Sequence, residues 1–163
     1  MMIQGVLGPI DTAELGQTLM HEHITCADWS MRMNFGARFF EFDQVAEIAA
    51  GQLGKAKALG VRTVVDGPPV NRGRDIRLIR EVARRTGLNF IASTGFYYQE
   101  EPWLYFRDEE EIYDLLMGDC ADGISGTGSK PGILKAGVGR GGLTPLLDSE
   151  GRPMKWLPEE GEI

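Results

Sequence analysis

An alternation of helix-period and strand-like segments between Glu41 and Thr94 most constrains the fold. Asp43 can cap a helix that Gly60 ends, and residues 61–65 then read as a buried strand. Alternating units of this kind predict parallel strands joined by helices. The apolar positions predicted for this first helix recur at three- and four-residue steps and are Val45, Ile48, Ala49, Leu53 and Ala56.

Two further units follow the first. Asp75 can cap a helix that stops at Gly87, before a strand at residues 88–92. Asp108 and Glu111 have capping-box spacing, and after a glycine-rich turn residues 133–138 form another candidate strand. Residues 18–23 are a further candidate strand, which brings the total to about four parallel strands. A closed (β/α)8 barrel has eight strands in ~250 residues.

The predicted fold is therefore α/β, a partial TIM (β/α)8 barrel of about the first four β/α units. We assign residues 1–138 to this half-barrel. Residues 139–163 lose the helical period and contain three prolines and five glycines, so an irregular tail is predicted there.

Composition narrows the class of partner. The net charge of -7 and the lack of a basic stripe argue against nucleic acid. No apolar run is long enough for a membrane span, and the first residues do not resemble a secretory leader. Cys26 and Cys120 form no C-x-x-C pair. A cytoplasmic protein that acts on a small molecule is expected.

His21 and His23 are the only histidines, and the two-residue period of a strand sends both side chains to one face. Two imidazoles on one face can bind one metal ion, with further ligands still needed. For an isolated H-x-H motif, a pair of hydrogen-bonded, half-buried histidines is the simpler interpretation. Lys135 lies in the apolar run GILKAGV, where it either has a function or extends its amine to solvent at the strand end.

Four ordered motifs, ELGQTLMHEHI, GVRTVVDGPPVNRGRD, NFIASTGFYY and GISGTGSKPGILKAGV, resemble the phosphotriesterase family of the amidohydrolase superfamily. The resemblance implies a hydrolase of lactones, esters or phosphotriesters with two divalent metals, expected to be Zn²⁺. It implies that His21, His23 and Lys135 are metal ligands, with Lys135 carboxylated to a carbamate that bridges the metals.

The resemblance also matches Tyr97 to a tyrosine that orients substrate in lactonase-like members. Packing of this aromatic ring on the barrel rim is the alternative, and the two are left open. Asp66 also ends a predicted strand, but the resemblance gives it no metal role, so a structural hydrogen bond is expected.

The chain departs from the family after Val138. Members supply two more histidines and an aspartate from later strands, and this sequence has no other histidine. No catalytic residue is therefore identified, and weak or absent activity is expected of the isolated chain. One alternative is a non-catalytic half-barrel that pairs with a second copy or a partner chain supplying strands. Another is that the tail is a gene-model artefact.

Overall fold

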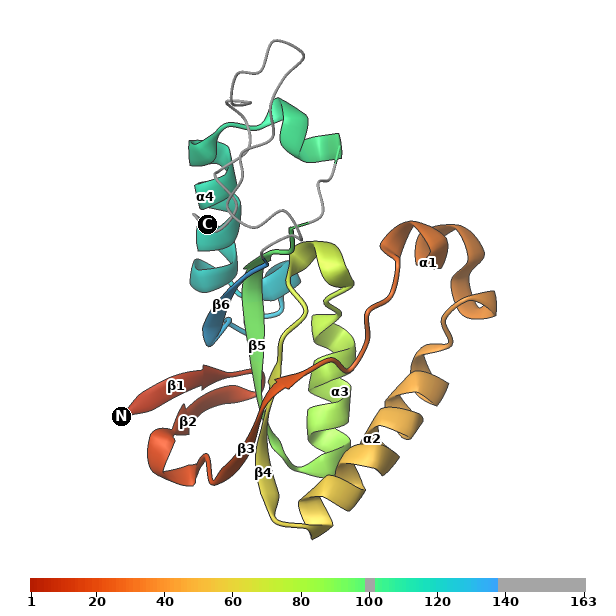
Figure 1. Ribbon diagram of the computed structural model, residues 1–163, viewed down its shortest axis with the longest axis vertical. Helices are drawn as coiled ribbons and strands as arrows, with labels where there is room; N and C mark the ends of the chain where they lie inside the picture. The colour runs from red at the N-terminus through yellow and green to blue at the C-terminus, as the bar shows by residue number, and fades with distance from the viewer. Residues whose placement is uncertain (99–101, 138–163) are drawn as a thin grey trace.

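A computed structural model describes residues 1–98 and 102–137. Four parallel strands form a curled sheet in the order β3 (Gln17–Glu22), β4 (Val61–Asp66), β5 (Asn89–Phe96) and β6 (Ile133–Ala136). The sheet forms half of a barrel (Figure 1). The predicted α/β fold with about four β/α units is confirmed. The tail predicted at 139–163 lies outside the described residues.

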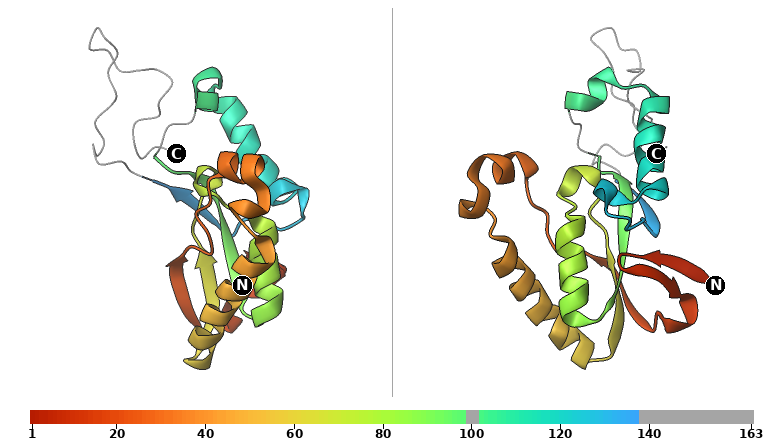
Figure 2. Two further views of the ribbon diagram at one scale, coloured as in Figure 1. Left: turned by 90° about the vertical axis from the view of Figure 1, so that its right-hand side faces the viewer. Right: turned by 180° about the vertical axis from the view of Figure 1, so that it is seen from behind.

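Three helices connect the strands: α2 (Phe42–Ala58), α3 (Ile76–Thr86) and α4 (Glu109–Ala121). Figure 2 shows α2 and α3 on one face of the sheet. A short helix, α1 (Trp29–Phe35), extends the connection from β3 to α2. Short 3-10 turns also occur: η1 (Thr12–Glu14), η2 (Gly36–Arg38), η3 (Val70–Arg72), η4 (Pro102–Phe106) and η5 (Ile124–Gly126).

Most of the predicted helix ends are confirmed. The Asp75 carboxylate accepts hydrogen bonds from the first turn of α3, and Gly87 ends that helix in the left-handed conformation. Asp108 and Glu111 form a reciprocal capping box on α4. The cap predicted at Asp43 is wrong, because α2 begins earlier and the Glu41 carboxylate accepts the first-turn N–H groups.

An antiparallel hairpin precedes the sheet and was not predicted. Its strands are β1 (Met2–Gly5) and β2 (Gly8–Asp11). The hairpin is joined to the sheet by a hydrogen bond from the Val6 N–H to the Phe90 carbonyl. Ile3 and Ile10 of the hairpin pack with Val65, so the hairpin covers part of the sheet face that points away from the helices.

The core lies on the helix face of the sheet. Val64 and Phe90 from the strands are fully buried there with Leu78, Ile79 and Val82 of α3. The opposite face has a much smaller buried cluster, Ile10, Val65 and Ile91. This opposite face, named the open face below, points toward the viewer in Figure 1. None of the described helices is long and apolar enough to cross a membrane.

Candidate functional site

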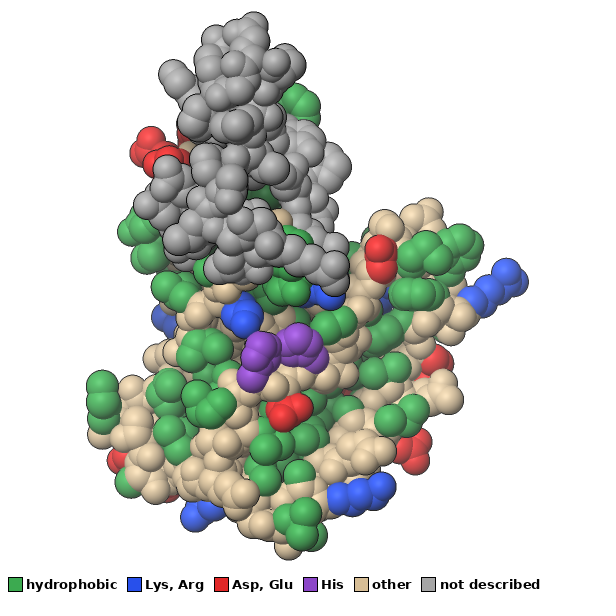
Figure 3. Space-filling model, in the orientation of Figure 1, with side chains coloured by type: hydrophobic (Ala, Val, Ile, Leu, Met, Phe, Trp, Pro, Cys, Tyr) green, Lys and Arg blue, Asp and Glu red, His purple; other side chains and the backbone are tan. Residues whose placement is uncertain are grey.

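A register shift in β3 decides which face the two histidines occupy. Leu19 pairs with Val64 and Glu22 pairs with Asp66, so β3 advances three residues while β4 advances two. Such an irregularity redirects the following side chains to the other face. Because residues in register share a face, Glu22 lies on the same side as Asp66 and Val64. His21 and His23 therefore lie on the open face, where Figure 3 shows both imidazoles exposed.

The two imidazoles converge at the carboxyl end of β3. The Nε2 atoms of His21 and His23 are 3.1 Å apart, and the ring centroids are 5.0 Å apart. Two nitrogens that each lie about 2.05 Å from one zinc ion, at angles of about 90–110°, are roughly 2.9–3.4 Å apart. The observed spacing fits two ligands of one divalent cation. It also fits a direct imidazole hydrogen bond.

The surroundings of His23 favour its neutral, ligating form. Partial burial lowers the pKa of His23 below its ordinary value, and the charges of His21 and Lys135 lower it further. The Cys26 sulfur lies 3.2 Å from His23 Nδ1, which leaves Nε2 directed at His21. Burial raises the pKa of the Cys26 thiol, so this group stays protonated at neutral pH. Cys26 was not singled out in the sequence, because its contact with His23 depends on a turn after the strand.

Lys135 lies on the same face as the histidines. It pairs in register with Gly95, two positions along β5 from Ser93 and four from the open-face residue Ile91. The two-residue alternation of a strand therefore places Lys135 on the open face, near the carboxyl edge. Its amine lies close enough for its charge to act on His23. No cluster of three or more histidine, cysteine or acidic side chains fit for metal binding occurs within residues 1–98 and 102–137.

Asp66 and Gly67 at the end of β4 contact the histidine segment directly. The Asp66 carboxylate accepts a hydrogen bond of 2.8 Å from the Ile24 N–H, which is the structural bond expected from the sequence. The Gly67 N–H donates to the Glu22 carbonyl, also at 2.8 Å. Burial raises the pKa of Asp66 to about 7.

Tyr97 immediately follows β5 at the rim of the sheet. Its N–H donates to the Asn71 side-chain oxygen at 2.6 Å, and its carbonyl accepts from the Asn71 amide. Its ring lies 4.8 Å from the Arg72 guanidinium carbon and 4.5 Å from the Tyr98 ring. These contacts agree with the rim-packing interpretation. The role of Tyr97 in substrate binding stays a prediction.

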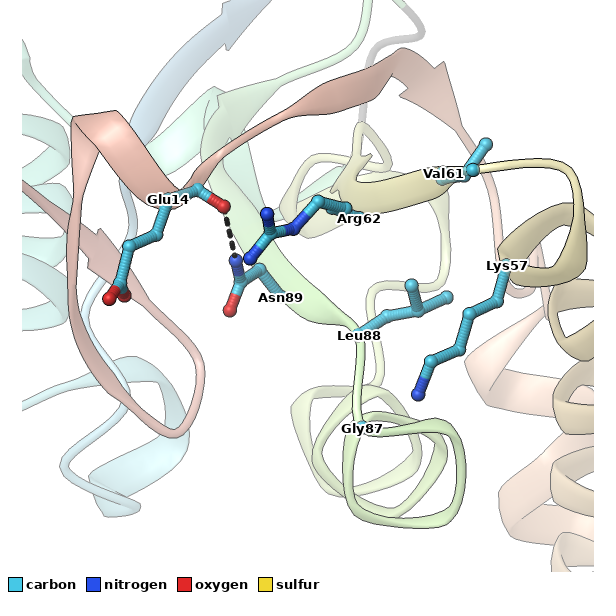
Figure 4. Close-up of a pocket in the computed structure, with 8 residues that line it drawn as sticks. Glu14, Lys57, Val61, Arg62, Gly87, Leu88 and Asn89 are labelled. Carbon is cyan, nitrogen blue, oxygen red and sulfur yellow. Dashed lines mark hydrogen bonds between the residues drawn. The ribbon is translucent and has the colours of Figure 1, made fainter.

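Within the described residues, depressions lie at both the carboxyl edge and the amino edge of the sheet. The first, of about 420 Å³, adjoins the histidine site through Cys26 and is also lined by Trp29, Asn71, Arg72 and Trp103. Its volume is within the range of small-molecule sites. The second, of about 510 Å³, lies at the amino edge, where Figure 4 shows Glu14, Lys57, Arg62 and Asn89 around it.

Comparison with known proteins identifies the family of the chain. The model of the phosphotriesterase family matches residues 1–150. A phosphotriesterase homology protein of Mycobacterium tuberculosis is 40% identical over 150 residues, which cover 86% of this chain and 46% of that protein. An aryldialkylphosphatase of Saccharolobus solfataricus is 34% identical over 137 residues, 83% of this chain and 43% of its own. An N-acetyltaurine hydrolase of Rattus norvegicus is 28% identical over 177 residues, 91% of this chain and 50% of its own.

The fold and the site thus define a class of protein: a half-barrel that carries an H-x-H pair at the carboxyl end of its first parallel strand. The chain belongs to the phosphotriesterase family. It spans about half the length of the curated relatives that it matches.

Proposed function

We propose that this chain provides the amino-terminal half of a metal-dependent hydrolase site. His21, His23 and Lys135 would hold divalent metal, with Zn²⁺ as the expected ion. The observation that carries this proposal is the 3.1 Å approach of the two Nε2 atoms on the open face. Family membership and the names of two relatives, an aryldialkylphosphatase and an N-acetyltaurine hydrolase, support hydrolysis.

Each protein group would have a distinct role in this site. The neutral imidazoles would donate their Nε2 lone pairs to the cation. Lys135 cannot bind a cation as an ammonium group, but its carbamate, formed from the free amine and carbon dioxide with loss of a proton, would offer oxygen ligands. A bound divalent ion would polarise the substrate oxygen and acidify water. Tyr97 would orient the substrate at the rim, beside the 420 Å³ depression that contains Arg72.

The proposed substrates are small esters, lactones or phosphotriesters. The name of one relative, an N-acetyltaurine hydrolase, adds N-acetyl amides to the proposed classes. We propose that turnover by this chain alone is weak, because its sequence contains no third histidine. The half-barrel organisation, with residues 1–138 as the folded unit and 139–163 as a tail, remains part of the same proposal, as does a cytoplasmic location.

The test combines zinc binding with hydrolysis by the full chain. The protein is incubated with zinc and bicarbonate and then assayed with an aryl dialkyl phosphate, an aryl ester, a lactone and N-acetyltaurine. We expect zinc binding that His21→Ala and His23→Ala each weaken at least about tenfold, whereas Lys57→Met at the opposite edge leaves it unchanged. Absence of zinc binding contradicts the metal role. Full turnover that His23→Ala abolishes contradicts the expectation of weak activity.

A second candidate is a half-barrel module that assembles with another chain. It is favoured by the sheet order, because β3 and β6 are the two outer strands of the described parallel sheet. Unpaired strand edges can associate with other chains. The partner would be a second copy or a chain that supplies the remaining strands. A monomer in light scattering at high protein concentration would count against the second copy.

A further inference from the structure

Asp66 contacts the chain on the carboxyl side of His23. Its carboxylate accepts the Ile24 N–H at 2.8 Å, although β3 has already ended at Glu22. On the amino side of His23, the Glu22 carbonyl accepts from the Gly67 N–H. The peptide groups on both sides of His23 are therefore tied to two consecutive residues of the neighbouring strand end.

This attachment follows directly after the irregular part of β3. Regular pairing is interrupted between Leu19 and Glu22, so the ladder by itself does not fix the direction of the histidines. The Asp66 carboxylate supplies an acceptor where no further backbone rung is available. Gly67 leaves space for the His21 ring, since a β carbon at that position would lie 2.9 Å from His21 Cδ2.

Burial of a carboxylate costs desolvation free energy, which a single hydrogen bond from an N–H group offsets only in part. Asp66 is 2% exposed, and desolvation opposes its charge. The bond to Ile24 needs only an acceptor oxygen at this position, which a neutral amide side chain would also supply. At the other end of the same strand, the Thr63 hydroxyl donates to the Leu15 carbonyl just before β3 begins.

We propose that Asp66 is a positioning residue that fixes His23 through the Ile24 amide and so holds the two Nε2 atoms together. This inference gives Asp66 a role in the site proposed above and rests on that function for its purpose. The geometry itself is independent of any bound metal, so it can be tested on the metal-free protein.

The experiment uses NMR of the full chain in the presence of a chelator. Hydrogen exchange reports the Ile24 N–H, and the NOE between the two imidazoles reports their approach, since the chain has only these two histidines. In the wild type we expect the Ile24 amide to exchange at least about tenfold more slowly than a free peptide, together with an imidazole–imidazole NOE.

Three variants separate positioning from stability. Asp66→Ala should lose both the slow exchange and the NOE. Asp66→Asn should keep both, because its amide oxygen can replace the carboxylate acceptor. Thr63→Val, matched in strand and burial, should lower the midpoint of unfolding while it keeps both signals.

Rapid exchange of Ile24 in the wild type overturns the proposal, as does an Asp66→Ala protein that keeps the NOE. If Asp66→Ala does not fold, Asp66→Asn decides: retention of both signals supports the proposal and loss of either overturns it. A separate zinc titration of the wild type tests the proposed function. Failure to bind zinc with the NOE intact contradicts the metal role and leaves the positioning role of Asp66 standing.

Discussion

The amino edge and the carboxyl edge of the sheet both carry polar side chains, which differ in what they contact. At the amino edge, Lys57 donates to the carbonyl of Thr86 at the end of α3, and Thr63 donates to the carbonyl of Leu15 just before β3. At the carboxyl edge, His21 and His23 stay exposed and face each other. Lys57 and Thr63 at the amino edge join segments of the fold, whereas the two imidazoles at the carboxyl edge contact each other and are exposed to solvent. In β/α barrels, function is concentrated at the carboxyl edge.

The largest expected effect concerns Asp75, at the carboxyl-edge end of α3. Its buried carboxylate caps the helix and forms an ion pair with Arg32. Asp75→Ala leaves the first-turn N–H groups of α3 and the Arg32 guanidinium without this partner. The substitution should cost about 3–5 kcal/mol in the free energy of unfolding. Chemical denaturation measures the loss. Asp108→Ala, which removes an exposed cap from α4, should cost only about 1 kcal/mol. Equal losses would show that burial and pairing at this edge add nothing.

The second effect is a pH dependence due to Asp66. Its pKa is raised to about 7 in the folded chain, above the ordinary value of 3.8. Between these two pH values the folded state holds a proton that the unfolded state has released. The contribution of Asp66 to the free energy of unfolding is therefore fully present below pH 3.8 and is lost as pH rises through 7. The loss should approach about 4 kcal/mol relative to Asp66→Asn, measured by denaturation at each pH. Parallel profiles for the two proteins would contradict this.

The smallest effect belongs to the amino edge. Lys57 donates a single hydrogen bond of 2.6 Å to the Thr86 carbonyl from an exposed position. Lys57→Met should cost less than about 1 kcal/mol, and zinc affinity should not change. Calorimetric zinc titration and chemical denaturation of the same sample check both values. A tenfold change in zinc affinity would mean that the two edges are coupled.

The sequence predicts well those features that depend on local spacing. Asp75, Gly87 and the Asp108–Glu111 pair mark helix ends because capping is determined within about four residues. The strands β4 and β5 were recognised from continuous apolar runs. The face of α2 was predicted less well: Ile48 is 58% exposed, while Ala46 is fully buried. A small alanine lets the helix approach the core closely, so Ala46 faces the core. The prediction followed the larger apolar side chains and therefore placed Ile48 there instead.

The candidate site could be predicted only in part. The H-x-H spacing establishes that both histidines share a face, but the face itself depends on the register shift against β4. With regular pairing from Leu19 onward, both imidazoles would lie on the helix face. The contacts of His23 with Cys26 and of Asp66 with Ile24 also depend on tertiary structure. The β1–β2 hairpin was missed because each strand has four residues and one contains Pro9.

The most direct test of the central claim is an anomalous difference map from crystals of the full chain grown with zinc. The X-ray data are collected at the absorption edge of zinc. We predict a peak within bonding distance, about 2.0–2.3 Å, of both the His21 and His23 Nε2 atoms, with Lys135 on the same side. The His21→Ala, His23→Ala double variant should show no peak there. A wild-type map with the two imidazoles hydrogen-bonded to each other and no metal beside them would contradict the account.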